Sequence, residues 1–293
     1  MIAFGEELAN GFARRPPVML GGDRSTCPVA LYDLGGEGPP LLGVHATGFC
    51  ARVLEPFANW AAGFRVYAID LRGHGRARCN LGSDFSWDAF SNDVLVAAEY
   101  LAGQGQHVYG FGHSCGGAAV LSAELARPNT FAAIYCYEPT VVLSQGVETH
   151  AERLATTALR RTRRFASRQA AYENFASKAP MNTFDPEALA GYVEGGFHDA
   201  GDDIELACDP EDEAAVYRSV PTPLAWDEIG QISVPVALGC GTQSNSFTPA
   251  VTAAIAARLK CHAEAFPGLG HFGPMQAPRV VAAKVASWFS AHL

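Results

Sequence analysis

The sequence predicts an α/β protein in which a mostly parallel, twisted sheet is covered by helices on both faces and carries a helical insertion. Short apolar runs bounded by Gly or Pro recur along the chain, and their length and residue types suit buried strands. Helix-period stretches separate most of these runs, which indicates parallel strands joined by helical crossovers. The alternation stops between about residues 144 and 230, so this segment is predicted to be an insertion.

The sequence predicts seven strands, four helices that cover the sheet, and an inserted cap. The expected strands are residues 29–35, 40–46, 64–71, 107–112, 131–138, 235–241 and 262–268. The helices expected to cover the sheet are residues 87–105, 117–128, 248–259 and 278–293. We predict a core formed by residues 1–143 and 231–293, and a helical cap, or lid, formed by residues 144–230.

The insertion has a helical pattern without strands, in the stretches 150–175, 185–197 and 209–220. Its apolar positions are unusually aromatic: Phe165, Tyr172, Phe175, Phe184, Tyr192, Phe197, Tyr217 and Trp226. These rings either pack the insertion onto the sheet or line a binding pocket.

Charge and hydropathy narrow the class of partner. Thirty acidic residues against 21 basic ones give a formal charge of −9, which disfavours nucleic acid and anionic membranes as partners. No uncharged apolar run is long enough to span a bilayer and the first residues do not resemble a signal peptide, so we expect a cytoplasmic protein. The oligomeric state stays open, with a homodimer as one option.

The cysteine and histidine patterns predict neither a metal site nor a disulfide framework. The eight cysteines are scattered singly, so buried free thiols are expected. The nine histidines form no HExxH or HxH pattern. Two stretches, GFGHSC and GCGTQS, begin like a dinucleotide fingerprint but lack its final glycine, and we expect no cofactor.

The stretch GHSCG, residues 112–116, fits GxSxG and lies between an expected strand and an expected helix. A strand that turns sharply into a helix crowds the neighbours of the middle residue, so only glycines fit there. The turn leaves the Ser114 hydroxyl projecting and aims the unpaired amides of the helix at it. We predict that Ser114 is a nucleophile rather than a helix cap.

From about residue 18 onward the chain resembles the α/β-hydrolase superfamily, because four motifs occur in the family's order. Besides the elbow at residues 112–116, VHATGF (44–49) is similar to the loop after the third strand, which carries half of the oxyanion hole. DLRGHG (70–75) is similar to the turn after the fourth strand of lidded members. GLGHFGP (268–274) is similar to the loop that carries the catalytic histidine.

This resemblance implies roles for individual residues. Ser114 would be the nucleophile and His271 the general base. The backbone amides of Cys115 and Thr47 would bind the oxyanion. Ala46 is the alternative to Thr47, because the family often has glycine at this position and the turn can therefore differ.

The acid that would complete a serine–histidine–acid triad is not at the position where the family usually has it. Most of the family has an Asp just after the seventh strand, where this chain has Ser244. No Asp or Glu lies between Glu228 and Glu264. Glu138 ends the strand at residues 131–138, on the edge of the sheet where such active sites gather, and certain lactone hydrolases of the superfamily carry their acid there. We predict that Glu138 orients His271.

Other interpretations of these acids stay open. Glu138 would alternatively cap or pair with the start of the insertion. Asp70 is a second candidate acid. Alternatively, Ser114 and His271 form a dyad without an acid, in which Gln243 or Asn245 supports His271.

The remaining polar motifs have less specific interpretations. His113 is expected to point away from Ser114 and pack, and His45 and His74 to stabilise loops. The arginine run ALRRTRRFASR either receives an anionic ligand or forms a solvated face neutralised by the segment DPEDE. As candidate substrate contacts we name Phe49, His113, Phe175, Tyr192 and Trp226.

The sequence thus predicts a lidded serine hydrolase of the α/β-hydrolase fold that cleaves a small-molecule carboxylic ester or lactone through an acyl-enzyme on Ser114, with a lactone or bulky aromatic ester as the preferred substrate class. Two alternatives remain: a C–C bond hydrolase or acyltransferase with the same triad, and a slow-turnover receptor that binds a ligand.

Overall fold

The computed structural model describes residues 16–21, 27–79, 84–103, 105–141, 147–219, 226 and 228–293. Its main feature is an eight-stranded sheet with the strand order β1-β2-β4-β3-β5-β6-β10-β11. The strands are β1 Val18–Leu20, β2 Val29–Gly36, β3 Pro40–Val44, β4 Arg65–Asp70, β5 Tyr109–His113, β6 Ala133–Tyr137, β10 Val236–Gly241 and β11 His262–Phe266.

All seven predicted strands are present, and the predicted mostly parallel sheet is confirmed. The strands from β4 to β11 run parallel, whereas β2 pairs antiparallel with both β1 and β4. The short strand β1 was not predicted, because three residues carry too little alternation to be recognised.

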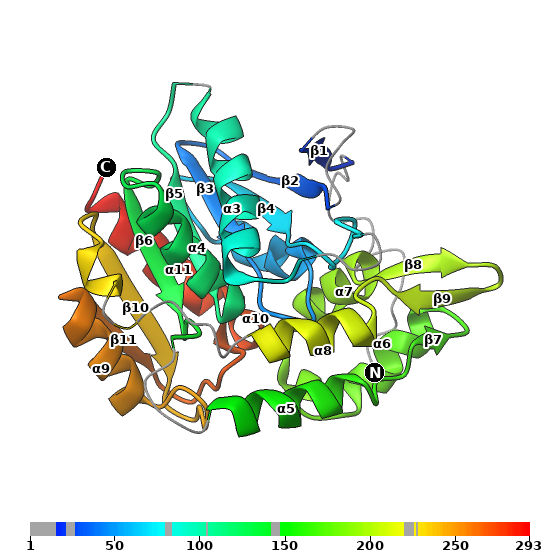
Figure 1. The fold of residues 1–293 in the computed structure, drawn as a ribbon. Coiled ribbons are helices and arrows are strands. Elements are labelled where there is room, and N and C mark those ends of the chain that lie inside the picture. Colours follow the sequence, from blue (N-terminus) through cyan, green and yellow to red (C-terminus); the bar gives the residue numbers. More distant parts are fainter. Residues whose placement is uncertain are drawn as a thin grey trace.

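The sheet is buried on both faces. Leu41 and Leu42, which are neighbours on β3, belong to two different clusters, because successive side chains of a strand point to opposite faces. Helices α3 Trp87–Ala102, α4 Cys115–Ala126 and α9 Pro249–Leu259 cover one face, and α11 Pro278–Ser290 and the short α2 Glu55–Ala58 cover the other (Figure 1).

The insertion lies at the edge of the sheet where the parallel strands end (Figure 1). Its helices are α5 Val147–Ala158, α6 Arg168–Ala176, α7 Pro186–Gly195 and α8 Pro210–Ser219. The expectation of a segment without strands is wrong: β7 Arg164–Phe165, β8 Phe197–Ala200 and β9 Asp203–Leu206 form a small antiparallel sheet. The turn at Gly201, with φ 72°, joins β8 to β9 in a region where the composition is mainly polar.

The short helical elements complete the description. They are η1 Ala51–Leu54, η2 Met181–Thr183, η3 Ile229–Gln231 and α10 Gly273–Gln276. No described helix is both long and apolar enough to cross a bilayer.

The expectation that the cysteines are free thiols is wrong for one pair. Cys27 and Cys79, 52 residues apart, form a disulfide that joins the chain before β2 to the segment after β4. Singly scattered cysteines give no signal for such a pair, because β2 and β4 come together only in the folded sheet. The other six are free.

Candidate active site

Ser114 stands at the sharp turn between β5 and α4. Its backbone has φ 54° and ψ −116°, a conformation that residues other than glycine rarely adopt. A Cβ at Gly112 would lie 2.5 Å from the Cα of Gly117, and one at Gly116 would lie 2.3 Å from the carbonyl oxygen of Val44. The glycines are therefore needed because the start of α4 is pressed against β5 and the end of β3.

His271 connects Ser114 to Glu138. Its Nδ1 lies 2.6 Å from Oε2 of Glu138, and its Nε2 lies 3.2 Å from Oγ of Ser114. The Glu138 side chain is fully buried, whereas that of His271 is 22% exposed. With Nδ1–H donated to the carboxylate, Nε2 is free to accept the hydroxyl proton of Ser114. The arrangement can activate a serine.

Glu138 is held by two further donors. The Gly241 amide donates to Oε1 over 2.8 Å, and the Ser244 hydroxyl donates to Oε2 over 2.8 Å. Ser244, which stands where the family's usual acid is expected, is itself buried and accepts from the Phe247 amide. Together with His271 Nδ1, these donors fix the orientation of the carboxylate. The role of Ser244 was missed, because a serine after a strand has many uses.

The other residues considered as partners of His271 have different surroundings. Asp70 is buried and accepts hydrogen bonds from Tyr32 Oη, the Ala51 amide and the Arg76 amide. Burial raises the pKa of its carboxyl to about 6, while these bonds act in the opposite direction. Gln243 and Asn245 are exposed. Glu138 bonds to His271 and does not cap the insertion.

Three further residues, Tyr137, His113 and Thr140, support the site. Tyr137 Oη donates to the Gly270 carbonyl, and His113 Nε2 donates to the His271 carbonyl, over 2.9 and 2.8 Å. Burial lowers the pKa of His113 well below its usual range, so the ring stays neutral. Thr140 Oγ1 lies 3.4 Å from Ser114 Oγ. His113 thus lies behind His271 and is not placed as a substrate contact; its expected packing role agrees with the structure.

The loop after β3 is held next to the elbow. His45 donates from Nδ1 to the Ala46 carbonyl and accepts from the Leu71 amide at Nε2, and His74 accepts from the Gly48 amide. Burial lowers the pKa of His45 to about 3, so the ring is a neutral part of the loop, as expected. The Thr47 side chain acts on the Cys115 thiol, where it opposes the rise in pKa that burial causes. The two residues predicted to supply oxyanion amides are therefore neighbours.

Comparison with known proteins agrees with this arrangement. Residues 41–284 match the alpha/beta hydrolase family. The chain belongs to this family.

Similar proteins include several esterases. Protein phosphatase methylesterase 1 of Mus musculus is 33% identical over 101 residues, 33% of this chain and 26% of that protein. A bifunctional esterase/perhydrolase of Acinetobacter calcoaceticus is 43% identical over 68 residues, 23% of each chain. The matches thus span about a quarter of these curated relatives.

Two solved structures share the fold of this α/β hydrolase over nearly its whole length. The crystal structure of E-2-(acetamidomethylene)succinate hydrolase superposes with a TM-score of 0.78 at 19% identity, covering 94% of this chain and 98% of the other. A thermophilic esterase from Thermogutta terrifontis gives a TM-score of 0.72 at 19% identity, covering 96% and 99%.

An aromatic cluster lies beside the triad of this α/β hydrolase. Phe49 lies 5.3 Å from Tyr192 and 5.7 Å from Phe272, ring centre to ring centre, and Phe272 lies 5.1 Å from His271. Phe175 extends the cluster, 5.4 Å from Tyr192. These rings pack the insertion onto the core next to the site.

Trp226, the remaining residue predicted as a substrate contact, is not part of that cluster. Its carbonyl accepts from Arg258 of α9, and its ring packs against the face of the sheet that α3, α4 and α9 cover. Trp226 therefore lies on that face, which the aromatic composition alone did not indicate.

Several arginines of the run pair with carboxylates of the insertion. Arg161 pairs with Glu213, and Arg163 pairs with Asp209 and Glu211, so the segment DPEDE is a partner as expected. Beyond this segment, Arg164 pairs with Glu205.

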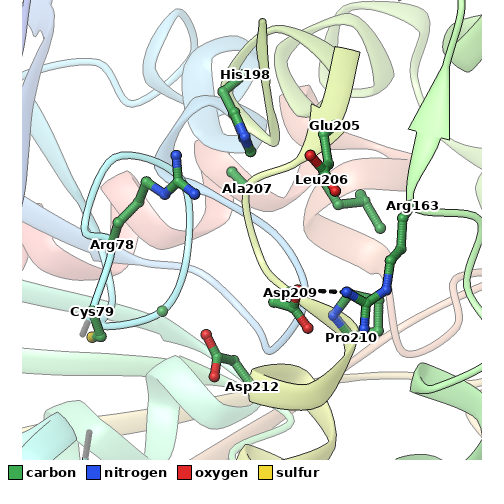
Figure 2. A pocket seen from close by; sticks show the side chains of 11 residues that line it. Arg78, Cys79, Arg163, His198, Glu205, Leu206, Ala207, Asp209, Pro210 and Asp212 are labelled. Atoms are coloured by element: carbon green, nitrogen blue, oxygen red, sulfur yellow. Dashed lines mark hydrogen bonds and ion pairs between the residues drawn. The ribbon is translucent and has the colours of Figure 1, made fainter. Parts of the chain in front are cut away.

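A charged cavity of about 150 Å³ lies between the loop after β4 and the insertion. Figure 2 shows Arg78 and His198 on one side and Asp212 on another, with Arg163 already bonded to Asp209. Neither the triad nor the predicted oxyanion residues line it. This cavity is therefore separate from the chemistry at Ser114.

Proposed function

We propose that the protein is a serine hydrolase that cleaves a carboxylic ester or lactone through an acyl-enzyme on Ser114. The observation that carries the proposal is the position of His271, hydrogen-bonded to both Ser114 Oγ and Glu138 Oε2. The esterase and methylesterase names of the relatives support the ester class.

In the proposed mechanism His271 Nε2 takes the proton from Ser114 as Oγ attacks the carbonyl carbon. The amides of Cys115 and Thr47, or of Ala46 in place of Thr47, stabilise the oxyanion. Glu138 stabilises the imidazolium, which then protonates the leaving group. A water molecule activated by His271 releases the acid and restores Ser114.

The insertion, residues 144–230, would act as the cap in this mechanism. Phe49, Phe175 and Tyr192 remain candidate contacts for an apolar acyl or alcohol group, because their cluster adjoins His271 through Phe272.

The test uses p-nitrophenyl acetate and a set of γ- and δ-lactones, with wild type and Ser114→Ala. We expect turnover by the wild type and a loss of at least about 10³-fold in kcat for the variant, with circular dichroism unchanged. A fluorophosphonate should add one mass equivalent to wild type and none to Ser114→Ala. A folded wild type that neither turns over nor is labelled would refute the proposal in favour of a binding protein.

A further inference from the structure

A buried ion pair of the insertion lies directly on the loop after β3. Arg161, which precedes β7, donates from Nη1 to Oε2 of Glu213 in α8 and from Nη2 to the hydroxyl of Tyr192 in α7. The side chains of Arg161 and Glu213 are only 19% and 7% exposed. Three separate segments of the insertion thus meet at one guanidinium.

This pair contacts Gly48 closely. A Cβ at Gly48, where φ is 80°, would lie 2.7 Å from Oε1 of Glu213 and 3.4 Å from Nη1 of Arg161. On its other side, the Gly48 amide donates to His74 Nε2 over 2.9 Å. Gly48 is therefore held between the insertion and the core, and the neighbouring Thr47 amide is fixed with it.

Arg161 differs from the other paired arginines of its run. The side chains of Arg163, Arg164 and Arg168 are 43%, 60% and 29% exposed and pair at the surface of the insertion. Ion pairs as exposed as these contribute little to stability. A buried pair is weak evidence for stability too, because apolar replacements of similar volume are often neutral or stabilising. Its position on Gly48 indicates a role in the geometry of the site.

We propose that Arg161 is a positioning residue that, through Glu213, holds Gly48 so that the Thr47 amide faces the oxyanion. The insertion is then a part of the oxyanion site and more than a cover for it. This inference rests on the function proposed above.

The test compares Arg161→Met and Arg161→Lys with a matched control, Arg218→Met. Arg218 pairs with Glu152 and so also links α8 to α5, but both side chains are about half exposed. We expect kcat on p-nitrophenyl acetate to fall 10- to 100-fold in Arg161→Met, with KM within threefold of wild type. Arg161→Lys, which keeps the charge, should lose less. The Ki of a trifluoromethyl ketone, whose hemiketal oxyanion needs the amides, should rise by the same factor as kcat falls, whereas Arg218→Met should match wild type in all three.

A second variant covers the case in which Arg161→Met fails to fold. The double variant Arg161→Met/Glu213→Leu leaves no buried charge unpaired, and it should show the same loss of kcat and of ketone affinity. Wild-type kcat and Ki in folded Arg161→Met or in the folded double variant would overturn the inference while leaving the proposed function intact.

Hydrogen exchange separates the two proposals. Amides of residues 45–50 should exchange at least tenfold faster in Arg161→Met than in Arg218→Met, and equal rates would overturn the inference. A wild type that neither turns over nor is labelled by fluorophosphonate would instead overturn the proposed function, and the exchange rates would still report whether Arg161 holds the loop.

Discussion

Replacing Glu138 by Gln tests the displaced acid with the smallest change of shape. The hydrogen bond from His271 Nδ1 to Oε2 is 2.6 Å long and the carboxylate is fully buried. The centres of the carboxylate and of the imidazolium that forms are therefore ~4 Å apart, and at an effective dielectric constant of ~20 their attraction is about 4 kcal/mol. Losing that stabilisation in the transition state corresponds to about a 10³-fold fall in kcat.

The assay is ester hydrolysis at pH 8, with thermal unfolding to confirm that the variant folds. Glu264→Gln is the matched control, because Glu264 pairs with Lys284 away from the triad, and its kcat should stay within twofold of wild type. A folded Glu138→Gln with kcat within tenfold of wild type would refute the assignment of the acid.

A compensating change strengthens the test. Ser244 already donates to the same carboxylate oxygen that His271 contacts, so an aspartate at this position should reach His271. We expect Glu138→Gln/Ser244→Asp to recover at least tenfold of the activity lost in Glu138→Gln. Ser244→Asp alone should be impaired, since it buries two carboxylates side by side.

Three further perturbations have defined outcomes. Gly116→Ala puts a methyl group against the Val44 carbonyl, so kcat should fall more than tenfold and stability by about 1–3 kcal/mol, measured by ester turnover and urea unfolding; wild-type values for both would contradict the packing. The folded-state pKa of His45 is lowered to about 3, so stability falls as pH decreases below 6.5 toward 3. In His45→Gln the slope of unfolding free energy between pH 6 and 4 should be shallower by about 1.4 kcal/mol per pH unit, and an unchanged slope would count against a neutral buried ring. Reducing the Cys27–Cys79 disulfide should lower stability by about 2–4 kcal/mol in wild type and not at all in Cys79→Ser, measured by thermal unfolding with and without reductant.

The strands of the main sheet were predictable because each is marked by a local sequence pattern. Runs such as residues 131–138 and 262–268 are short, apolar and bounded by turn residues, and strands formed within both. The hairpin of β8 and β9 was not predictable in the same way. HDA and DDIE are mainly polar, and the hairpin buries only Phe197, Ile204 and Leu206, which are too few to form an apolar run that marks two strands in the sequence.

The predicted nucleophile and base lie together, because each belongs to a motif whose spacing fixes its place on the fold. The contacts from the insertion were harder to foresee. Phe49 and Tyr192 meet, whereas Trp226 packs on the opposite face of the sheet. An aromatic composition predicts that rings are buried. Which rings are buried together depends on the path of the chain in the fold.

The position of the acid follows from the pairing of two strands. β6 and β10 are parallel neighbours with Tyr137 opposite Gly239, so the residues after each strand emerge at the same point of the sheet edge. The Glu138 amide donates to the Gly239 carbonyl, and φ of 46° at Glu138 turns its side chain across β10 toward the Gly241 amide. The extra methylene of glutamate spans the distance that an aspartate after β10 would not need. Ser244 fills the place left at the end of β10 with a donor, so the carboxylate oxygens end up against His271 although the residue that supplies them has moved to the neighbouring strand.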